Sequence, residues 1–175
     1  MDPISGATRL DDWFVLLDPA WEPPTPSSPP PAEVIVGGWM VDDDGDPGPF
    51  QPNPSYVPAS EATPTDPTDA LLRRIGEGAS AGSALISLVR NSVVELGCDE
   101  HDQPMVDSSP DGVSCVLVAT AELQKLGVPV VRWWPVLGSE LPGVVPPGTD
   151  ILLNLNGHAP FRLSTDALSR ADRDF

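Results

Sequence analysis

Residues 149–168 read TDILLNLNGHAPFRLSTDAL and carry the clearest fold signal in the chain. The run ILL at 151–153 is continuously apolar, which is typical of a strand buried on both faces. The Asn-rich segment 154–157 follows, and Asn and Gly tolerate the positive φ angles of tight turns. Apolar residues then alternate with Arg over 161–163, as in a half-buried strand. The stretch therefore predicts a strand, a turn and a second strand.

A helix is expected directly after this second strand. Ser164 or Thr165 can cap its N-terminus, and Asp166 lies in its first turn, where the helix dipole favours a negative charge. Upstream, the apolar run SCVLVA at 114–119 is the best candidate for a central strand. Thr120 is expected to cap a short helix that follows this strand.

Other strand and helix signals lie on either side of these segments. Asp66 followed by Pro67 predicts a helix start, because Asp caps helices and Pro is favoured at the first helical position. A further helix is indicated by the apolar spacing within 80–90. The additional strand candidates are 13–17, 33–41, 92–96 and 128–136, the last at a sheet edge because of its prolines.

Proline usage shapes the expected domain organisation. The chain has 23 prolines in 175 residues, more than twice the average usage of about 5%. We therefore expect an α+β fold: a single domain over 13–171, with a mixed β-sheet, two or three packed helices and Pro-rich loops at 19–32 and 47–67. Residues 1–12 and 172–175 are expected to be flexible tails.

Two polar segments each allow more than one interpretation. The Pro/Ser run at 23–31 is expected to be solvated and extended, as a linker or as a ligand for a Pro-recognising module. The acidic segment 42–46 superficially resembles a calcium-binding loop. Its sixth position is Pro47 rather than Gly, and its flanks are a strand and a proline loop. An acidic hairpin turn is therefore the favoured interpretation, with no metal bound.

The charge balance bears on the class of partner. Nine basic and 26 acidic residues give a net charge of −17, which argues against nucleic acid and against anionic membrane surfaces. No apolar run approaches the roughly 18 residues needed for a membrane helix. The N-terminal segment lacks the pattern of a signal peptide. We expect a cytoplasmic protein without membrane insertion.

Catalytic and cofactor motifs were sought around the histidines and cysteines. Cys98 and Cys115 accompany apolar strands, and the sequence leaves open whether they pair. Neither these residues nor His101 and His158 have the spacing of a metal site. The sequence also has no nucleophile elbow and no phosphate-binding glycine loop. We therefore expect a non-enzymatic protein with no catalytic residues, no metal and no cofactor.

Aromatic and acidic residues are the remaining candidates for function. Trp133 and Trp134 are adjacent, so on a strand they face opposite sides. One of them can face outward as a protein contact, or both can cover the sheet beneath Pro-rich loops. The candidate partner-binding residues are Trp39, Tyr56, Trp133, Trp134, Asp42, Asp43 and Asp44.

Three segments together resemble the type VII secretion system-associated protein family of actinobacteria. They are WFVLLDPAW at 13–21, the segment 50–73 that begins FQPNPSYVPAS, and SPDGVSCVLVATAE at 109–122. The resemblance covers most of the chain and implies an accessory role near a secretion machine. The expected partner is a protein, either a secretion substrate or a machine component.

A second resemblance concerns the C-terminal half alone. CVLVATAE at 115–122, together with PPGTDILLNLNGHAPFRLSTDAL at 146–168, is similar to the N-terminal domain of SseB-type proteins. The usual Asn-Pro-Gly turn of that domain is replaced by Asn-Leu-Asn-Gly at 154–157. This resemblance implies an α+β fold and, as the alternative function, a regulatory domain that senses a small molecule or a peptide.

Overall fold

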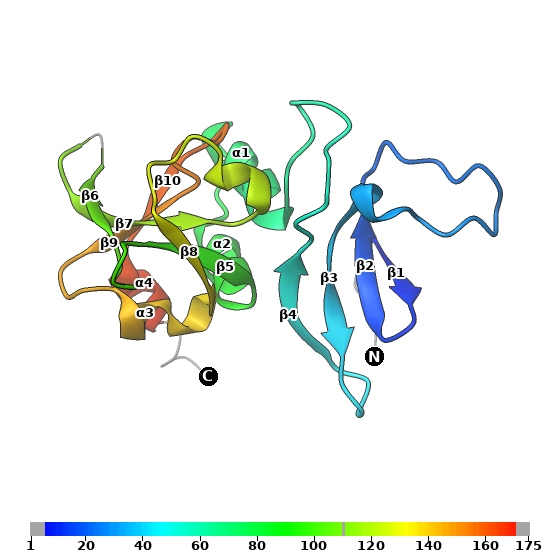
Figure 1. Cartoon of the computed structure of the whole chain (residues 1–175), viewed down its shortest axis with the longest axis horizontal. Helices are drawn as coiled ribbons and strands as arrows, with labels where there is room; N and C mark the ends of the chain where they lie inside the picture. The colour runs from blue at the N-terminus through cyan, green and yellow to red at the C-terminus, as the bar shows by residue number, and fades with distance from the viewer. Residues whose placement is uncertain (1–5, 110, 171–175) are drawn as a thin grey trace.

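The computed structural model describes residues 6–109 and 111–170. The expected α+β class is confirmed, in one compact domain that contains two β-sheets (Figure 1). The N-terminal sheet is antiparallel, with the order β1-β2-β3-β4. Its strands are β1 (Ala7–Leu10), β2 (Trp13–Leu17), β3 (Ile35–Val41) and β4 (Pro47–Pro52).

The second sheet is the mixed sheet that the sequence predicts. It has the order β10-β9-β7-β5-β8, and β6 also pairs with β7. β7 and β9 are parallel, whereas the other pairs are antiparallel. The strands are β5 (Val93–Cys98), β6 (Val106–Ser108), β7 (Ser114–Ala119), β8 (Arg132–Leu137), β9 (Asp150–Leu153) and β10 (Phe161–Leu163). The central position of β7 and the edge position of β8 agree with expectation.

Helices cover one face of the mixed sheet. The α-helices of the described residues are α1 (Pro67–Gly76), α2 (Gly82–Arg90), α3 (Leu141–Val144) and α4 (Thr165–Arg170). Leu72 and Val89 from α1 and α2 pack on Val116 and Ile151 of the sheet in the main core. The opposite face is covered more thinly, by apolar residues such as Val130 from the loop before β8. None of the helices in the described ranges has the length and apolarity to span a bilayer.

Several expected boundaries need correction. Residues 1–12 were expected to form a tail, yet Ala7–Leu10 pair with β2 as strand β1. The expected loop 47–67 begins instead with strand β4 (Pro47–Pro52), because its non-proline residues can still bond to β3. Residues 1–5 and the expected tail at 172–175 lie outside the described residues.

The prolines of β4 explain why two sheets form. In the sequence PGPFQP only Gly48, Phe50 and Gln51 keep a backbone N–H, so β4 lacks half of the donors that a central strand would need. Towards the second sheet it makes a single bridge, in which the Phe50 N–H donates to the Asn91 carbonyl over 2.8 Å. The sheets therefore meet side by side at β4 without merging (Figure 1).

A buried polar network connects α1 to the mixed sheet. Asp66 caps α1 as expected, and its Oδ1 accepts the backbone N–H groups of Thr68 and Asp69. Its Oδ2 accepts the hydroxyls of Thr65, over 2.9 Å, and Thr120, over 2.7 Å. Burial raises the pKa of Asp66, whereas these hydrogen bonds act in the opposite direction.

Thr120 and Asn154 extend this network to the ends of β7 and β9. Asn154 adopts a positive φ of 52°, as a turn residue should, but its side chain is also buried. Its Oδ1 accepts the Thr120 N–H over 3.0 Å, and its Nδ2 donates to the Thr120 hydroxyl over 2.9 Å. The expected capping role of Thr120 is therefore wrong: its hydroxyl is held by Asp66 and Asn154, and the turn Glu122–Lys125 has no side-chain cap.

Replacing Thr120 by Val should destabilise the protein by about 1–3 kcal/mol, because Asp66 would lose a donor inside the core. Urea unfolding at neutral pH measures the change. Thr8→Val is the matched control, since Thr8 is exposed on the edge strand β1, and it should change stability by less than about 0.5 kcal/mol. Equal effects of the two substitutions would contradict a structural role for the network.

Candidate functional site

Two of the predicted contact residues belong to the core of the N-terminal half. Trp39 is half-buried and packs edge-to-face on Phe50, with ring centroids 4.9 Å apart. Tyr56 is only 4% exposed, and its hydroxyl donates to Asp18 over 2.8 Å. The prediction that Tyr56 contacts a partner is therefore wrong, because this phenol anchors the Pro-rich loop to β2 and β3. The face of Trp39 that meets Phe50 is likewise unavailable to a partner.

The tryptophan pair on β8 does present one outward ring. Trp134 is 54% exposed and Trp133 is half-buried, as the alternation of side chains along a strand requires. The pair nevertheless lies in the mixed sheet, whereas Asp42, Asp43 and Asp44 form the turn between β3 and β4 (Figure 1). The structure therefore does not gather the predicted contact residues into one surface.

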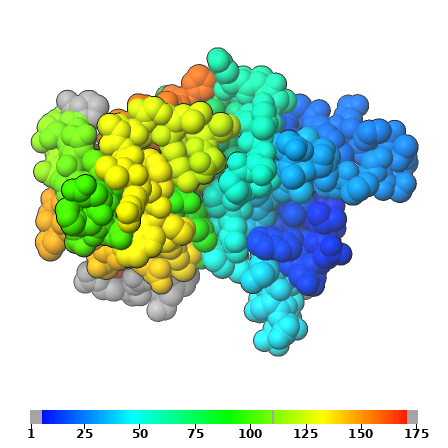
Figure 2. All heavy atoms as spheres, in the orientation of Figure 1, coloured from blue at the N-terminus to red at the C-terminus, as the bar shows by residue number. Residues whose placement is uncertain are grey.

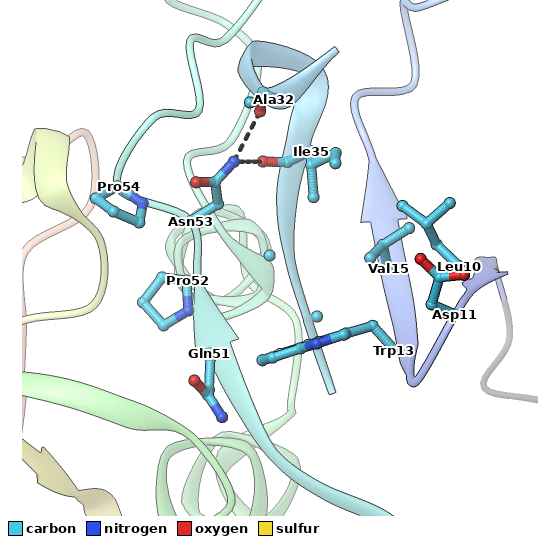
Figure 3. A pocket seen from close by; sticks show the side chains of 12 residues that line it. Leu10, Asp11, Trp13, Val15, Ala32, Ile35, Gln51, Pro52, Asn53 and Pro54 are labelled. Atoms are coloured by element: carbon cyan, nitrogen blue, oxygen red, sulfur yellow. Dashed lines mark hydrogen bonds between the residues drawn. The ribbon is translucent and has the colours of Figure 1, made fainter. Parts of the chain in front are cut away.

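A groove on the N-terminal sheet is the most site-like feature of the described residues. It has a volume of about 450 Å³, and every residue that lines it lies between positions 10 and 54 (Figure 3). Trp13 and Val15 reach it from β2, and Gln51 reaches it from β4. The full lining is Leu10, Asp11, Trp13, Val15, Ala32, Ile35, Gly37, Gly38, Gln51, Pro52, Asn53 and Pro54.

Two adjacent glycines of β3 form the floor of this groove. A Cβ on Gly38 would lie 2.6 Å from the Phe14 carbonyl oxygen and 3.3 Å from the Trp13 ring. A Cβ on Gly37 would collide with the Phe50 ring on the other side of the strand. Each glycine therefore lets one aromatic ring lie close to the backbone, Trp13 in the groove and Phe50 in the core.

The rim of the groove is held rigid by Asn53. Its amide Nδ2 donates to the Ala32 carbonyl over 2.7 Å and to the Ile35 carbonyl over 2.8 Å (Figure 3). Its Oδ1 accepts the Ser55 N–H over 3.0 Å. These three bonds fix the segment after β4 against the start of β3, so the groove is preformed.

Two polar groups in the groove have no partner within the described part of the chain. Neither the Trp13 indole N–H nor the Gln51 side-chain amide makes a hydrogen bond to another described residue. Together they supply donors and an acceptor beside an otherwise apolar wall. Such a surface suits a ligand that has both apolar side chains and backbone amides.

Acidic residues gather at one end of the groove. Asp11 lines it, and the carbonyl of Asp12 accepts the Val41 N–H over 2.8 Å, next to the acidic turn. Within that turn, Asp42 Oδ1 accepts the backbone N–H groups of Asp44 and Asp46, which makes it the hairpin turn predicted from the sequence. The hairpin turn projects beyond the body of the molecule (Figure 2).

A second hollow, of about 340 Å³, lies beneath the Pro-rich loop and includes His158 and Arg73. Arg73 cannot serve a ligand there, because its guanidinium bonds Asp69 and the carbonyls of Glu61 and Ala62. His158 is exposed at the edge of this hollow. His101 lies in a separate exposed turn, so the two histidines are not brought together.

The cysteines are free and lie on opposite faces of the mixed sheet. Burial raises the pKa of both Cys98 and Cys115, which keeps them as neutral thiols at neutral pH. The described ranges contain no cluster of three or more His, Cys, Asp or Glu side chains that could hold a metal.

Sequence reasoning placed Trp13 only in the apolar strand candidate 13–17 and did not count it among the contact residues. The signal that could have found it is the Gly-Gly pair at 37–38, where a Cβ would meet the Phe50 or the Trp13 ring. Comparison with protein-family models, with curated proteins and with solved structures finds no match to this chain.

Gly38→Ala should lower the free energy of unfolding by about 1–3 kcal/mol, because its Cβ meets a backbone oxygen that cannot move aside easily. Gly82→Ala is the control: Gly82 opens α2, and a Cβ there meets no atom within 4 Å. It should be neutral or stabilising by up to about 1 kcal/mol. Denaturant unfolding followed by tryptophan emission tests both, and a neutral Gly38→Ala would contradict the groove geometry.

Asp18 should give the N-terminal half a dependence on pH. Burial alone would raise the pKa of Asp18, but hydrogen bonds from the Ala20 N–H, the Tyr56 hydroxyl and the Ala59 N–H hold it below its ordinary value. The carboxylate therefore contributes stability above the unfolded pKa of about 3.9, and this contribution is lost as the pH falls through the native pKa.

Asp18→Asn should cost about 1–3 kcal/mol at pH ~7, and the gap to the unsubstituted protein should shrink on acidification to pH ~2–3. Urea titrations at both pH values measure the gap. Glu22→Gln, at an exposed position, serves as the control. A gap of the same size at both pH values would show that the native pKa is not lowered.

Proposed function

We propose that this chain is a non-enzymatic accessory protein that binds a partner protein through the open face of its N-terminal sheet. The single observation that carries this proposal is the preformed groove beside Trp13, whose lining combines apolar walls with two polar groups that have no hydrogen-bond partner among the described residues. Trp is enriched among residues that dominate protein interfaces, because its large ring has one polar edge.

The resemblance to type VII secretion-associated proteins supplies the proposed context. The segment WFVLLDPAW that carries part of this resemblance contains Trp13 and Val15, which line the groove. We propose that the partner is a secretion substrate or a component of the secretion machine, met in the cytoplasm. The net charge of −17 supports a protein partner over nucleic acid.

The chemistry of the reactive side chains supports a role without catalysis. Cys98 and Cys115 are buried thiols with raised pKa values, whereas a nucleophilic cysteine needs a lowered one. His101 and His158 lie in separate exposed turns. A catalytic histidine works with a nucleophile and an orienting acid within hydrogen-bonding reach, and neither position offers that combination.

A regulatory domain that senses a small molecule or a peptide is the second candidate, favoured by the volume of the groove, which lies outside the C-terminal segments that resemble SseB-type proteins. About 450 Å³ falls within the range of about 300–1,000 Å³ that is typical of small-molecule sites. This alternative expects a metabolite to raise the melting temperature of the isolated protein. The Trp13→Ala variant should lose that response if the metabolite occupies the groove.

Trp13→Ala should weaken partner capture from the native host at least about tenfold, which corresponds to a typical interface hot spot. The measurement is quantitative mass spectrometry of proteins retained by the immobilised chain, with secretion components scored separately. Trp134→Ala is the matched control, because it removes the same side chain from an exposed position on the other sheet. Gln51→Ala gives an independent change in the same groove.

The variants that lose partner capture show which surface binds the partner. Loss with Trp13→Ala and Gln51→Ala, but not with Trp134→Ala, supports the proposed site. Loss with Trp134→Ala alone would move the partner to β8. Retention of no secretion component by the unsubstituted protein would count against the proposed context.

A further inference from the structure

The partner class follows from the shape of the open sheet face. Among residues 6–109 and 111–170, those that line the groove come from the N-terminal sheet and the segments that flank its strands, and none comes from the mixed sheet. Its floor is flat because Gly38 carries no side chain on this face, where the Trp13 ring lies close to the backbone. A flat strip along a strand accommodates an extended segment better than a helix, whose diameter is about 10–12 Å.

The two unpaired polar groups match the needs of an extended backbone. An extended peptide exposes N–H and C=O groups at its edge, and these must find partners when they leave water. The Gln51 amide can both donate and accept, and the Trp13 indole can donate. Leu10 and Ile35, which are half-buried in the groove lining, offer apolar surface to the peptide's side chains.

The charges around the groove select a basic partner. Between residues 6 and 54 the sequence contains nine acidic residues and one basic residue, a net charge of −8. That one basic residue, Arg9, lies over the Phe14 ring at 5.1 Å. Because Phe14 and Trp13 are adjacent on β2, Arg9 is on the face opposite the groove. Its Nε also donates to the backbone carbonyl of Asp11, so Arg9 is the one basic side chain of the N-terminal sheet near the acidic end. The acidic residues of this half still outnumber it by nine to one.

From these features we infer that the groove binds an extended peptide segment of a partner protein, with apolar residues beside Trp13 and Lys or Arg at the acidic end. This inference depends on the proposed function and names the class of partner for the same site. A second copy of this chain is a poor occupant, because two molecules of charge −17 repel each other. A partner of opposite charge gains in both rate and specificity of association.

The test is selection from a random peptide display library on the immobilised full chain. Peptides enriched on the unsubstituted protein should contain an apolar cluster with an excess of Lys and Arg on one side. Trp13→Ala and Gln51→Ala should each reduce their binding at least about tenfold. Binding should also weaken as salt rises from ~0.05 M to ~0.5 M, since exposed charges are screened.

Two charge-matched variants separate the acidic end from the overall charge. The first combines Asp11→Asn, Asp12→Asn, Asp43→Asn and Asp44→Asn, and should weaken the selected peptides at least about fivefold. The second replaces four exposed glutamates elsewhere by Gln and should have little effect. Its positions are Glu61, Glu77, Glu100 and Glu140.

Each outcome supports or overturns a stated part of this proposal. Selected peptides that need Trp13 but show no basic excess would overturn the partner class and leave the proposed function standing. Peptides that bind Trp13→Ala unchanged would overturn the site, and with it the proposed function. No enrichment, or a dimer by light scattering that Trp13→Ala dissociates, would show that the groove does not take a peptide from a partner.

Discussion

The missing backbone donors of β4 are the constraint on which the rest of the architecture depends. A strand at the centre of a sheet needs N–H groups on both sides, and the sequence PGPFQP provides three in six residues. The N-terminal strands therefore end as a separate sheet, joined to the mixed sheet by one bridge at Phe50. Because the sheet is separate, it has two faces of its own.

The two faces of this sheet differ in burial. On each face, one glycine of β3 lets one aromatic ring, Phe50 or Trp13, lie close to the backbone. Phe50 covers Gly37 on the inner side and packs with Tyr56 in a small core. Trp13 covers Gly38 on the outer side, where its ring is half-buried and lines the groove. A larger residue at either position would force the ring away from the backbone. The groove is therefore a consequence of the same close approach that builds the inner core.

The sequence predicted the mixed sheet better than the N-terminal sheet, for a physical reason. Buried strands such as β7 and β9 are continuously apolar, and the Asp66-Pro67 helix start has a direct capping mechanism. The pairing of β4 was missed because its prolines are typical of loops. Its remaining backbone groups form a strand only because β3 lies beside them as a hydrogen-bonding partner. Sequence patterns within a short window also do not show which side chains are buried by segments far away in the sequence.

Particular residues of the candidate site show the same limit. Tyr56 and Trp39 are residue types that are common at protein contacts. In the fold, however, Tyr56 bonds to Asp18 and Trp39 packs on Phe50, and both partners lie on other segments of the chain. Trp13 belongs to a fully apolar strand, yet in the structure it is half-buried and lines the groove. Asn154 was correctly predicted to make a turn, whereas its bonds to Thr120 depend on β7 and β9 lying side by side.

The distribution of charge makes the two ends of the open sheet face different, because acidic residues gather at one of them. Arg9 lies over the Phe14 ring and donates to the Asp11 carbonyl, while the acidic turns between strands gather at one end. Turns favour Asp for local reasons, because its carboxylate can accept nearby backbone N–H groups, as Asp42 does. The β1–β2 and β3–β4 hairpins have their turns at the same end of the sheet, so they bring such Asp residues together. The fold itself does not need this negative charge. The asymmetry costs some repulsion, and a basic partner segment at that end would relieve it.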